Sequence, residues 1–186
     1  MSSFGLADYV QKVTELVTDI DDPHKLVESI MPLKEKLLQV EGLIPDEFLV
    51  EQESLQYTRN LLHADPKGRF VVMALVWKAG AETPPHDHKT WGVVGTYRNA
   101  MSVVNFAEPK DEGGALEICG EGDLSAGSVV GVVPPRLCNL HIMKNPTDQP
   151  TITIHTYGDP ADTCRLYCKE TGAESDVNLA FHQKLA

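Results

Sequence analysis

The stretch Gly80–Gly95, GAETPPHDHKTWGVVG, determines how the rest of the sequence is interpreted. It places His86 and His88 one residue apart. Residues two apart in a β-strand point to the same face, so an extended conformation turns both imidazoles the same way. Pro84 and Pro85, directly before them, disfavour a helix and favour an extended entry. Neutral imidazole binds Fe, Zn, Cu and Ni, so this stretch predicts part of a metal site that other residues must complete.

A third histidine, His141, lies far downstream in a predicted strand, within NLHIMKN. The spacings G-x5-H-x-H and H-x3-N resemble the two sequence motifs of the cupin barrel. The usual first motif has a glutamate shortly after the second histidine, whereas this sequence has Gly92 and Val93 there and no carboxylate before Glu108. The pattern therefore predicts a three-histidine site. Such a site leaves coordination positions open for anionic ligands such as a thiolate, which is typical of a catalytic metal site.

The composition fits one soluble globular domain. The chain has 186 residues, of which 42% are hydrophobic and 23% charged. We expect a single domain over residues 1–186, with a helical N-terminal cap over 1–50 and a β-barrel with a C-terminal tail over 51–186. The net charge of −11 provides no basic surplus for binding phosphates. It argues against nucleic acid or an anionic membrane as a partner.

No segment marks the chain for a membrane or for secretion. No apolar run approaches the roughly 20 residues of a membrane span. The N-terminal stretch MSSFGLADYVQ lacks the basic and apolar regions of a signal peptide. The four cysteines, Cys119, Cys138, Cys164 and Cys168, include no C-x-x-C pair. We therefore expect a cytoplasmic protein with reduced thiols.

The N-terminal quarter shows helical patterns. Apolar residues three and four apart predict a helix over 4–20 and a second that starts at Pro23 and ends near residue 40. Asp22 suits the N-cap of the second helix, whereas Pro32 is expected to break or kink it. A further short helix is predicted over 45–48.

Short β-branched runs separated by glycine and proline dominate the remainder and predict an all-β sandwich or barrel. A turn is expected at Gly120–Asp123. In the run TITIH, threonine and isoleucine alternate, so His155 and Tyr157 should share the polar face with Thr153. The predicted strands are Arg69–Lys78, Trp91–Tyr97, Ala100–Phe106, Leu116–Cys119, Ser128–Val133, Asn139–Lys144 and Thr151–Tyr157.

Further motifs resemble the cysteine dioxygenase family of thiol dioxygenases. The resemblance extends from about Gln56 to His182. Besides the histidine pair and the H-x3-N spacing, it rests on YTRNL at Tyr57–Leu61, H-x-Y at His155–Tyr157, DTC at Asp162–Cys164, TG at Thr171–Gly172 and FHxK at Phe181–Lys184.

This resemblance implies a fold, a cofactor and a reaction. The implied fold is mainly β, a cupin (jelly-roll-like) β-barrel with N-terminal helices. The implied cofactor is one mononuclear non-haem Fe(II) with His86, His88 and His141 as ligands. The implied reaction adds both atoms of O2 to a thiol and gives a sulfinic acid. The expected partners are therefore a small-molecule thiol and O2.

The resemblance also assigns catalytic and substrate-binding residues. Arg59 is expected to bind the substrate carboxylate, because its planar guanidinium matches a carboxylate with two hydrogen bonds. Tyr57 is expected to line the same pocket. Tyr157 would place its hydroxyl near the iron, His155 would orient Tyr157, and Thr153 would support His155.

Two departures from the family pattern affect these expectations. Animal cysteine dioxygenases carry a cysteine shortly after the H-x-H pair that cross-links to the active-site tyrosine. No cysteine lies between His88 and Cys119 here, so Tyr157 should be unmodified. The family also contains 3-mercaptopropionate dioxygenases, which often carry glutamine in place of Arg59. Arg59 therefore favours L-cysteine as the substrate and cysteine sulfinic acid as the product.

Two alternatives stay open. The stretch WGVVG is also common among the mercaptopropionate-type enzymes, so 3-mercaptopropionate is the alternative thiol. The second alternative is a non-enzymatic, metal-binding cupin, since a fold does not fix a function. The oligomeric state does not follow from the sequence.

Overall fold

The computed structural model describes residues 4–50, 52–107, 114–134, 140–159 and 162–185. The helices of these residues are α1 (Leu6–Asp19), α2 (Pro23–Leu38) and the 3-10 helix η1 (Asp46–Phe48). The strands are β1 (Tyr57–Ala64), β2 (Phe70–Trp77), β3 (His86–Asp87), β4 (Gly92–Arg98), β5 (Ala100–Ala107), β6 (Glu117–Ser125), β7 (Val129–Val132), β8 (Leu140–Lys144), β9 (Thr151–Gly158), β10 (Thr163–Tyr167), β11 (Glu174–Asn178) and β12 (Gln183–Lys184).

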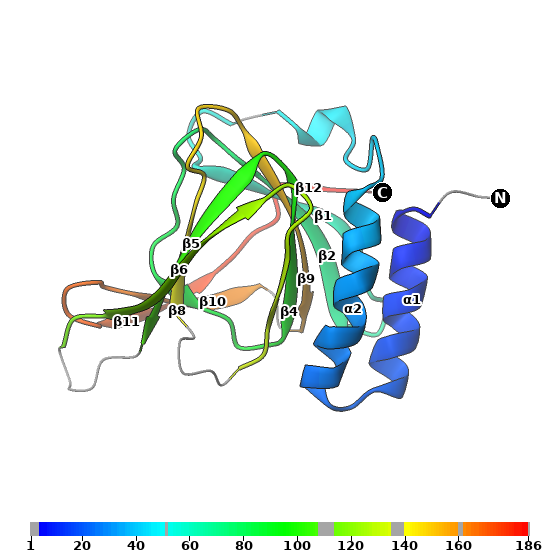
Figure 1. The fold of residues 1–186 in the computed structure, drawn as a ribbon, viewed down its shortest axis with the longest axis horizontal. Helices are drawn as coiled ribbons and strands as arrows, with labels where there is room; N and C mark the ends of the chain where they lie inside the picture. The colour runs from blue at the N-terminus through cyan, green and yellow to red at the C-terminus, as the bar shows by residue number, and fades with distance from the viewer. Residues whose placement is uncertain (1–3, 51, 108–113, 135–139, 160–161, 186) are drawn as a thin grey trace.

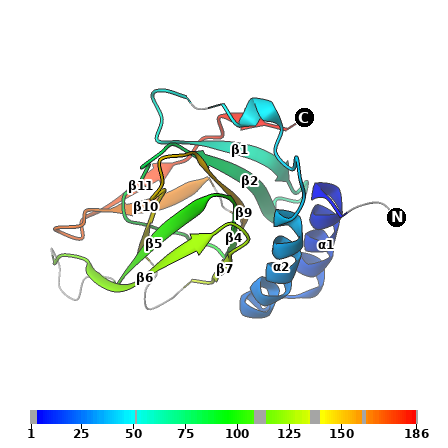
Figure 2. The same ribbon diagram turned by 45° about the horizontal axis from the view of Figure 1, so that its top comes forward.

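Two six-stranded sheets form the barrel. The first has the order β12-β1-β2-β9-β4-β7 and the second has the order β11-β10-β3-β8-β5-β6. Apolar side chains of both sheets fill the space between them, including Trp77 and Val94 of the first sheet and Met101 and Met143 of the second. α1 and α2 cover the outer face of the first sheet (Figures 1 and 2). The prediction of a mainly β, jelly-roll-like cupin barrel with N-terminal helices is confirmed.

The two helices pack through the apolar faces that their spacing predicts. Tyr9 and Val13 of α1 and Ile30 of α2 are completely buried. They belong to one apolar cluster with Phe70 of β2 and Ile154 of β9. The outer face of the first sheet is therefore covered by the helices, while its inner face is left to the barrel interior.

The second helix begins as predicted but does not end at its proline. Asp22 Oδ1 accepts the backbone N–H groups of His24 (2.9 Å) and Lys25 (3.2 Å), which confirms the N-cap. Pro32 was expected to break or kink this helix, and α2 runs without a break through it. Pro32 is exposed, so water can bind the carbonyl that loses its intrahelical partner.

The β-structure contains more strands than the sequence predicts. β1, β3, β10, β11 and β12 were not among the predicted strands. The predicted turn at Gly120–Asp123 is wrong, because β6 continues through it and pairs Gly120 with Asn105 and Gly122 with Val103 of β5. Pairing with a neighbouring strand supplies hydrogen bonds that outweigh the local preference of glycine for turns.

A buried polar cluster joins the helices to β9. Lys34 of α2 is completely buried, and its Nζ donates to Thr156 Oγ1 (2.7 Å) and the carbonyl of Ile154 (3.3 Å). The hydroxyl of Tyr9 lies 2.8 Å from the same Thr156 Oγ1, and Lys34 Nζ lies 4.8 Å from the Tyr9 ring centroid. Burial lowers the pKa of Lys34 well below its usual value and raises that of Tyr9.

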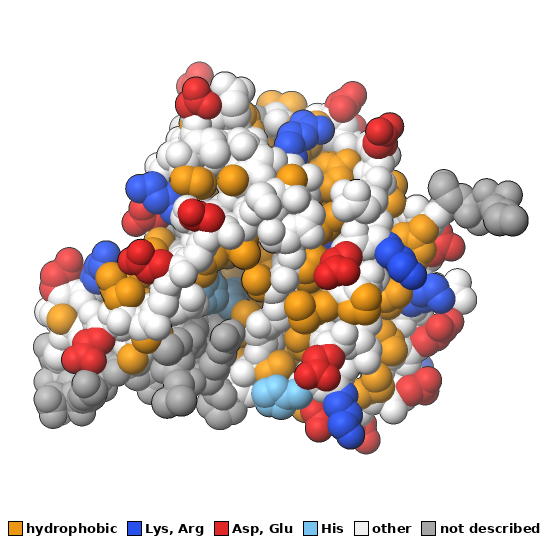
Figure 3. Space-filling view, viewed as in Figure 1, with side chains coloured by type: hydrophobic (Ala, Val, Ile, Leu, Met, Phe, Trp, Pro, Cys, Tyr) orange, Lys and Arg blue, Asp and Glu red, His pale blue; other side chains and the backbone are white. Residues whose placement is uncertain are grey.

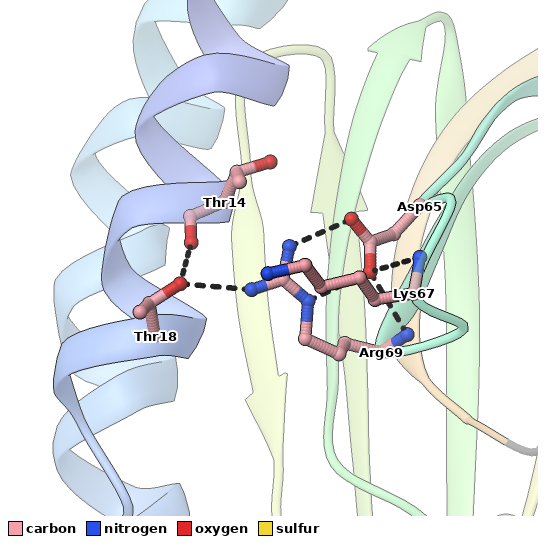
Figure 4. A network of polar contacts seen from close by, with 5 residues as sticks. All are labelled: Thr14, Thr18, Asp65, Lys67 and Arg69. Atoms are coloured by element: carbon pink, nitrogen blue, oxygen red, sulfur yellow. Dashed lines mark hydrogen bonds and ion pairs between the residues drawn. The ribbon is translucent and has the colours of Figure 1, made fainter.

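A second polar network ties the β1–β2 turn to α1 (Figure 4). Asp65 Oδ2 accepts from the backbone N–H groups of Lys67 (3.2 Å) and Arg69 (3.1 Å). The Arg69 guanidinium donates to both Asp65 oxygens at 2.7 Å and to Thr18 Oγ1 at 2.8 Å. The Arg69 hydrogen bond is the main cause that lowers the pKa of Asp65 to about 2. Gly68 completes the turn with a φ of +67°, which favours glycine.

The cysteines differ from the expectation of reduced thiols. Cys119 is disulfide-bonded, so the expectation is wrong for this residue. Cys164 and Cys168 are free thiols. Cys138 lies outside the described residues. Separately, none of the helices in the described ranges is long and apolar enough to cross a membrane.

Candidate metal centre and its pocket

Three histidines from neighbouring strands of the second sheet come together inside the barrel. His86 lies on β3, His88 follows that strand directly, and His141 lies on β8 in register with His86. Their ring centroids are 4.4 to 5.1 Å apart. One potential ligand nitrogen of each ring lies within 4.8 Å of the other two. Within the described ranges, these three form the only such group of His, Cys, Asp or Glu side chains.

The histidines offer neutral nitrogen atoms to the space between them. His86 Nδ1 donates to the carbonyl of Pro84 (3.0 Å), since a carbonyl oxygen can only accept, and this leaves its Nε2 unprotonated. Burial lowers the pKa of His86 and lowers that of His88 well below its usual value. Neutral imidazole is the form that binds Fe(II) and other divalent transition metals. The donor set therefore fits a metal site and is compatible with iron.

The residue between the two histidines anchors the short strand that carries them. Asp87 Oδ2 accepts the hydroxyl of Tyr167 (2.9 Å), and its Oδ1 accepts the backbone N–H of Arg165 (3.3 Å). Both partners belong to β10. Because β3 has only two residues, these side-chain bonds add substantially to the backbone bonds that fix its direction. Asp87 is thus held away from the histidine centre, which among the described residues contains imidazoles alone.

A chain of hydrogen bonds leads along β9 to the histidines. The indole N–H of Trp77 donates to Thr153 Oγ1 (2.8 Å), which lies 2.7 Å from His155 Nε2. His155 Nδ1 lies 3.0 Å from the Tyr157 hydroxyl, which lies 3.2 Å from His88 Nε2. Alternate residues of a strand face the same side, so residues 153, 155 and 157 form one row.

Trp77 fixes the direction of the first bond in this chain, because its indole N–H can only donate. Thr153 Oγ1 accepts that bond, and it either donates its own proton to His155 Nε2 or accepts a second bond from it, according to the tautomer of His155. In the tautomer that carries its proton on Nδ1, His155 donates to the Tyr157 oxygen, and the Tyr157 hydroxyl proton then points to the side of His88. Burial lowers the pKa of His155 well below its usual value and raises that of Tyr157, which keeps both groups neutral.

Gly92 makes room for the ring of Tyr157. The two residues are paired in register between β4 and β9. A Cβ atom at position 92 would overlap the Tyr157 ring. That ring stacks on His88 with a centroid distance of 4.5 Å. A side chain at this position would displace the tyrosine from the histidine.

Arg59 on β1 is held by the C-terminal segment of the chain. Its side chain is buried, which lowers its pKa by desolvation. The guanidinium lies 5.0 Å from the Phe181 ring centroid and donates to the carbonyl of Ala180 (3.4 Å) and the sulfur of Met73 (3.5 Å). The backbone of Arg59 exchanges bonds with His182, donating to its Nδ1 (2.9 Å) and accepting from its N–H (2.8 Å).

Arg59, His86 and His88 line one cavity of about 260 Å³. We call it the thiol pocket, after the substrate that the family resemblance implies. This volume is near the lower end for small-molecule pockets, so it suits a small substrate. All but one of the metal, catalytic and substrate-binding residues named from the sequence line this pocket. The exception, His141, faces a second cavity on the other side of the centre. The named residues that line the thiol pocket are Tyr57, Arg59, His86, His88, His155 and Tyr157.

Comparison with known proteins assigns the chain to a family. Residues 3–170 match the family model described as Cysteine dioxygenase type I. The chain belongs to the cysteine dioxygenase type I family. Among curated members, human cysteine dioxygenase type 1 is 26% identical over 134 residues, which cover 71% of this chain and 66% of the human protein. The zebrafish (Danio rerio) protein is 25% identical over 136 residues, with the same coverage. The matched region therefore spans slightly less than two thirds of these relatives.

Solved structures of cupins also resemble this cysteine dioxygenase family member. The Schizosaccharomyces pombe Cnp3 cupin domain is 20% identical and has a TM-score of 0.46, covering 64% of this chain and 74% of that one.

Some pocket residues of this family member were missed by sequence reasoning. Trp77 ends a strand that was predicted, and the alternation Met73, Leu75, Trp77 places it on the inner face. Its bond to Thr153 depends on the register between β2 and β9, in which Trp77 pairs with Thr151. That register has no local sequence signal. The FHxK motif contributes to the family resemblance, but the sequence does not predict that its phenylalanine, Phe181, packs on Arg59.

Proposed function

We propose that the protein is an Fe(II)-dependent thiol dioxygenase that converts L-cysteine and O2 to cysteine sulfinic acid. One O2 adds to one thiol, so the sulfur loses four electrons, O2 gains them, and the thiol proton is retained in the acid. The carrying observation is a three-histidine centre, two of whose histidines line one cavity with a buried arginine. Membership of the cysteine dioxygenase type I family supports the same chemistry.

In this proposal, His86, His88 and His141 hold the iron. Three neutral imidazoles leave the metal charge uncompensated by protein, which favours a thiolate over a neutral thiol as the substrate ligand. Iron supplies open coordination positions and the electron transfer that allows O2 to react with sulfur. Asp87 and its β10 partners keep the strand of the first two histidines in place.

Arg59 binds the substrate carboxylate. A buried guanidinium has lost much of its hydration, so a carboxylate that approaches it compensates the charge and forms strong, charge-assisted hydrogen bonds. Ala180 and Phe181 hold the guanidinium in position, and Tyr57 lines the pocket beside it. The carboxylate and the thiol of a three-carbon amino acid can then occupy the two ends of the cavity.

Tyr157 holds a proton at the side of the histidine centre. Its hydroxyl is available to donate to the substrate carboxylate or to a developing oxygen charge. Thr153 and His155 orient it through the chain of bonds that begins at Trp77. Gly92, and not a cysteine, lies against the ring, which supports an unmodified Tyr157.

The test is O2 consumption and product analysis with Fe(II)-loaded protein and three thiols: L-cysteine, 3-mercaptopropionate and cysteamine. We expect the highest kcat/KM with L-cysteine, because it has both the carboxylate that Arg59 binds and an amine. A preference for 3-mercaptopropionate would identify the alternative dioxygenase. No O2 consumption with any thiol, despite bound iron, would favour the non-enzymatic metal-binding cupin.

A variant separates the role of Arg59 from iron binding. Arg59→Ala should raise the KM for L-cysteine about 10- to 100-fold, the loss expected for hydrogen bonds to a charged group. Its iron content should equal that of the wild type. The matched control is Arg98→Ala, an exposed arginine on β4, which should leave both quantities unchanged. A collapse of iron content in Arg59→Ala would overturn the assigned role.

The proposal includes a cytoplasmic location, because Fe(II) and a free thiol substrate persist in a reducing compartment. The free thiols of Cys164 and Cys168 support it, whereas the disulfide of Cys119 does not. Fractionation of the source cells, with detection of the protein in the soluble cytoplasmic fraction, checks this part.

A further inference from the structure

A second cavity reaches the histidine centre from the opposite side of the barrel. Its volume is about 410 Å³, and it lies between β4 and β7 of the first sheet and β5 and β6 of the second. These strands end the two sheets on the side away from β1 and β10. We call it the aliphatic cavity after its principal lining residues, Val94, Val103, Leu124, Val129, Val130 and Val132.

The aliphatic cavity and the thiol pocket share a wall that contains the centre. His86 and His88 line the thiol pocket, His141 lines the aliphatic cavity, and Tyr157 lines both. In the space-filling view, a histidine side chain is visible at depth in a hollow among hydrophobic side chains (Figure 3). The centre can thus be approached from two sides.

The two cavities differ in chemistry. The thiol pocket contains the cations Arg59 and Lys89, which suit a carboxylate. The described lining of the aliphatic cavity contains no lysine or arginine, and its one acidic residue, Glu121, is exposed. A negatively charged thiol therefore gains nothing there. A small apolar molecule is stabilised by entering the aliphatic cavity, because apolar solutes prefer apolar cavities to water.

Val103, Leu124 and Val130 face the barrel interior but are only partly buried. Their partial exposure reflects the unfilled space of the aliphatic cavity that they line. In the proposed function, the thiol pocket holds the thiol and its carboxylate, beside two histidines of the centre and Arg59. A reactant that arrives through the thiol pocket while the thiol is bound would have to pass it, whereas the aliphatic cavity gives a path to His141 that the thiol does not occupy.

We propose that the aliphatic cavity is the route by which O2 reaches the histidine centre, separate from the route of the thiol. This inference rests on the proposed dioxygenase function. It assigns the two substrates to the two sides of the centre. The side chains of Val103 and Leu124 then determine how easily O2 passes, without contacting the thiol.

The first test uses xenon, an apolar probe, in crystals of the iron-loaded protein. Xenon should occupy the aliphatic cavity of the wild type. Val103→Phe should exclude xenon, because the phenyl ring would occupy the cavity. The ring can be accommodated because Val103 pairs with Gly122, which has no side chain. The control, Val104→Phe, makes the same change on the next residue of β5, which does not line the cavity, and should retain xenon. The inference would be overturned if xenon occupied only the thiol pocket, or if ordered water filled the aliphatic cavity.

The second test measures the KM for O2 and the KM for the thiol separately. Val103→Phe should raise the KM for O2 several-fold and leave the KM for L-cysteine and the iron content unchanged. Leu124→Phe serves as a second variant if the first does not fold. An unchanged KM for O2 in an active variant would overturn this inference and leave the proposed function standing. A wild type that holds iron but oxidises no thiol would overturn both.

Discussion

The two faces of β9 are both buried and both carry hydrogen-bonded polar side chains, yet they differ in what they contact. On the helix side, Thr156 binds Lys34 and Tyr9 in a closed cluster. On the interior side, His155 and Tyr157 form a row whose last hydroxyl lies beside the histidine centre. Burial shifts the pKa values of groups on both faces. Shifted pKa values alone therefore do not identify the functional face.

The two faces of β9 differ in whether their polar side chains line a cavity. His155 and Tyr157 of the interior row line the thiol pocket, whereas neither Thr156 nor its partners are among the described residues that line either cavity at the centre. The same chemical substitution on the two faces should therefore have opposite consequences. Interior changes should affect iron or turnover at nearly constant stability. Helix-side changes should affect stability at nearly constant turnover.

The largest effect is expected from removal of a metal-binding histidine. His86→Ala should lose bound iron and all thiol oxidation, because two imidazoles hold the ion too weakly. The metal-free variant should melt close to the metal-free wild type, since the interior space around the ring is a cavity. Metal analysis, O2 consumption and thermal unfolding measure the three outcomes. Full activity in this variant would remove His86 from the proposed ligands.

A matched pair of tyrosines gives the sharpest contrast between the faces. Tyr157→Phe should lower kcat about 100-fold, the lower end of the range for a positioned acid or base, with iron retained. Tyr9→Phe removes the same atom on the other face, where the hydroxyl binds Thr156. It should cost about 1 kcal/mol of unfolding free energy and leave kcat unchanged. Equal loss of kcat in both variants would contradict the distinction.

Lys34 should make stability depend on pH above neutrality. Its folded-state pKa lies below the unfolded value of about 10.4 because burial disfavours its charge. Its contribution is therefore fully present above the unfolded pKa and is lost as pH falls toward the folded pKa. Between these values the wild type should gain up to about 1.4 kcal/mol per pH unit, and Lys34→Met should remove that gain.

Urea unfolding at pH 7 and pH 9 measures this slope as a difference between the wild type and the variant. Lys12→Met, an exposed lysine of α1, is the control and should keep the wild-type slope. Turnover of Lys34→Met under conditions where it is folded should match the wild type. A loss of kcat at full iron content would show that the helix side of β9 also supports catalysis.

Local patterns were sufficient to predict much of the fold. The helical spacing of α1, the Asp22 cap and the long β-branched runs of β2 and β9 all specify their elements without distant partners. Strands that depend on pairing were missed. β3 has two residues and exists because β8 and β10 flank it. β6 crosses the predicted turn at Gly120–Asp123 because β5 pairs along it.

The same distinction applies to the site. The residues named from motifs and from the family resemblance lie together around the centre, although their roles stay predictions. What the sequence did not predict depends on strand register and on packing between sheets. The bond from Trp77 to Thr153, the contact of Phe181 with Arg59, and the aliphatic cavity are of this kind. The single-domain assignment to residues 1–186 also stays a prediction.

The smallest expected effect lies outside both faces of β9, at the β1–β2 turn. The hydrogen bonds of Arg69 lower the folded pKa of Asp65 to about 2, below the unfolded value of about 3.9. This stabilisation is present above the unfolded pKa and is lost as pH falls through the folded one, so it should decline between about pH 4 and pH 2. Asp65→Asn should cost about 1 kcal/mol at pH 6, typical of a partly exposed ion pair, and less at pH 3.

Urea unfolding of the wild type and Asp65→Asn at the two pH values measures this difference, and kcat should not change in the variant. The network joins the turn to α1 through Thr18, so its loss loosens the helix layer without reaching the barrel interior (Figure 4). An effect on kcat would mean that the position of α1 is transmitted through the Thr156 cluster to His155 and Tyr157. That result would show that the two faces of β9 are coupled. Helix-side and interior substitutions would then differ only in how strongly they change kcat.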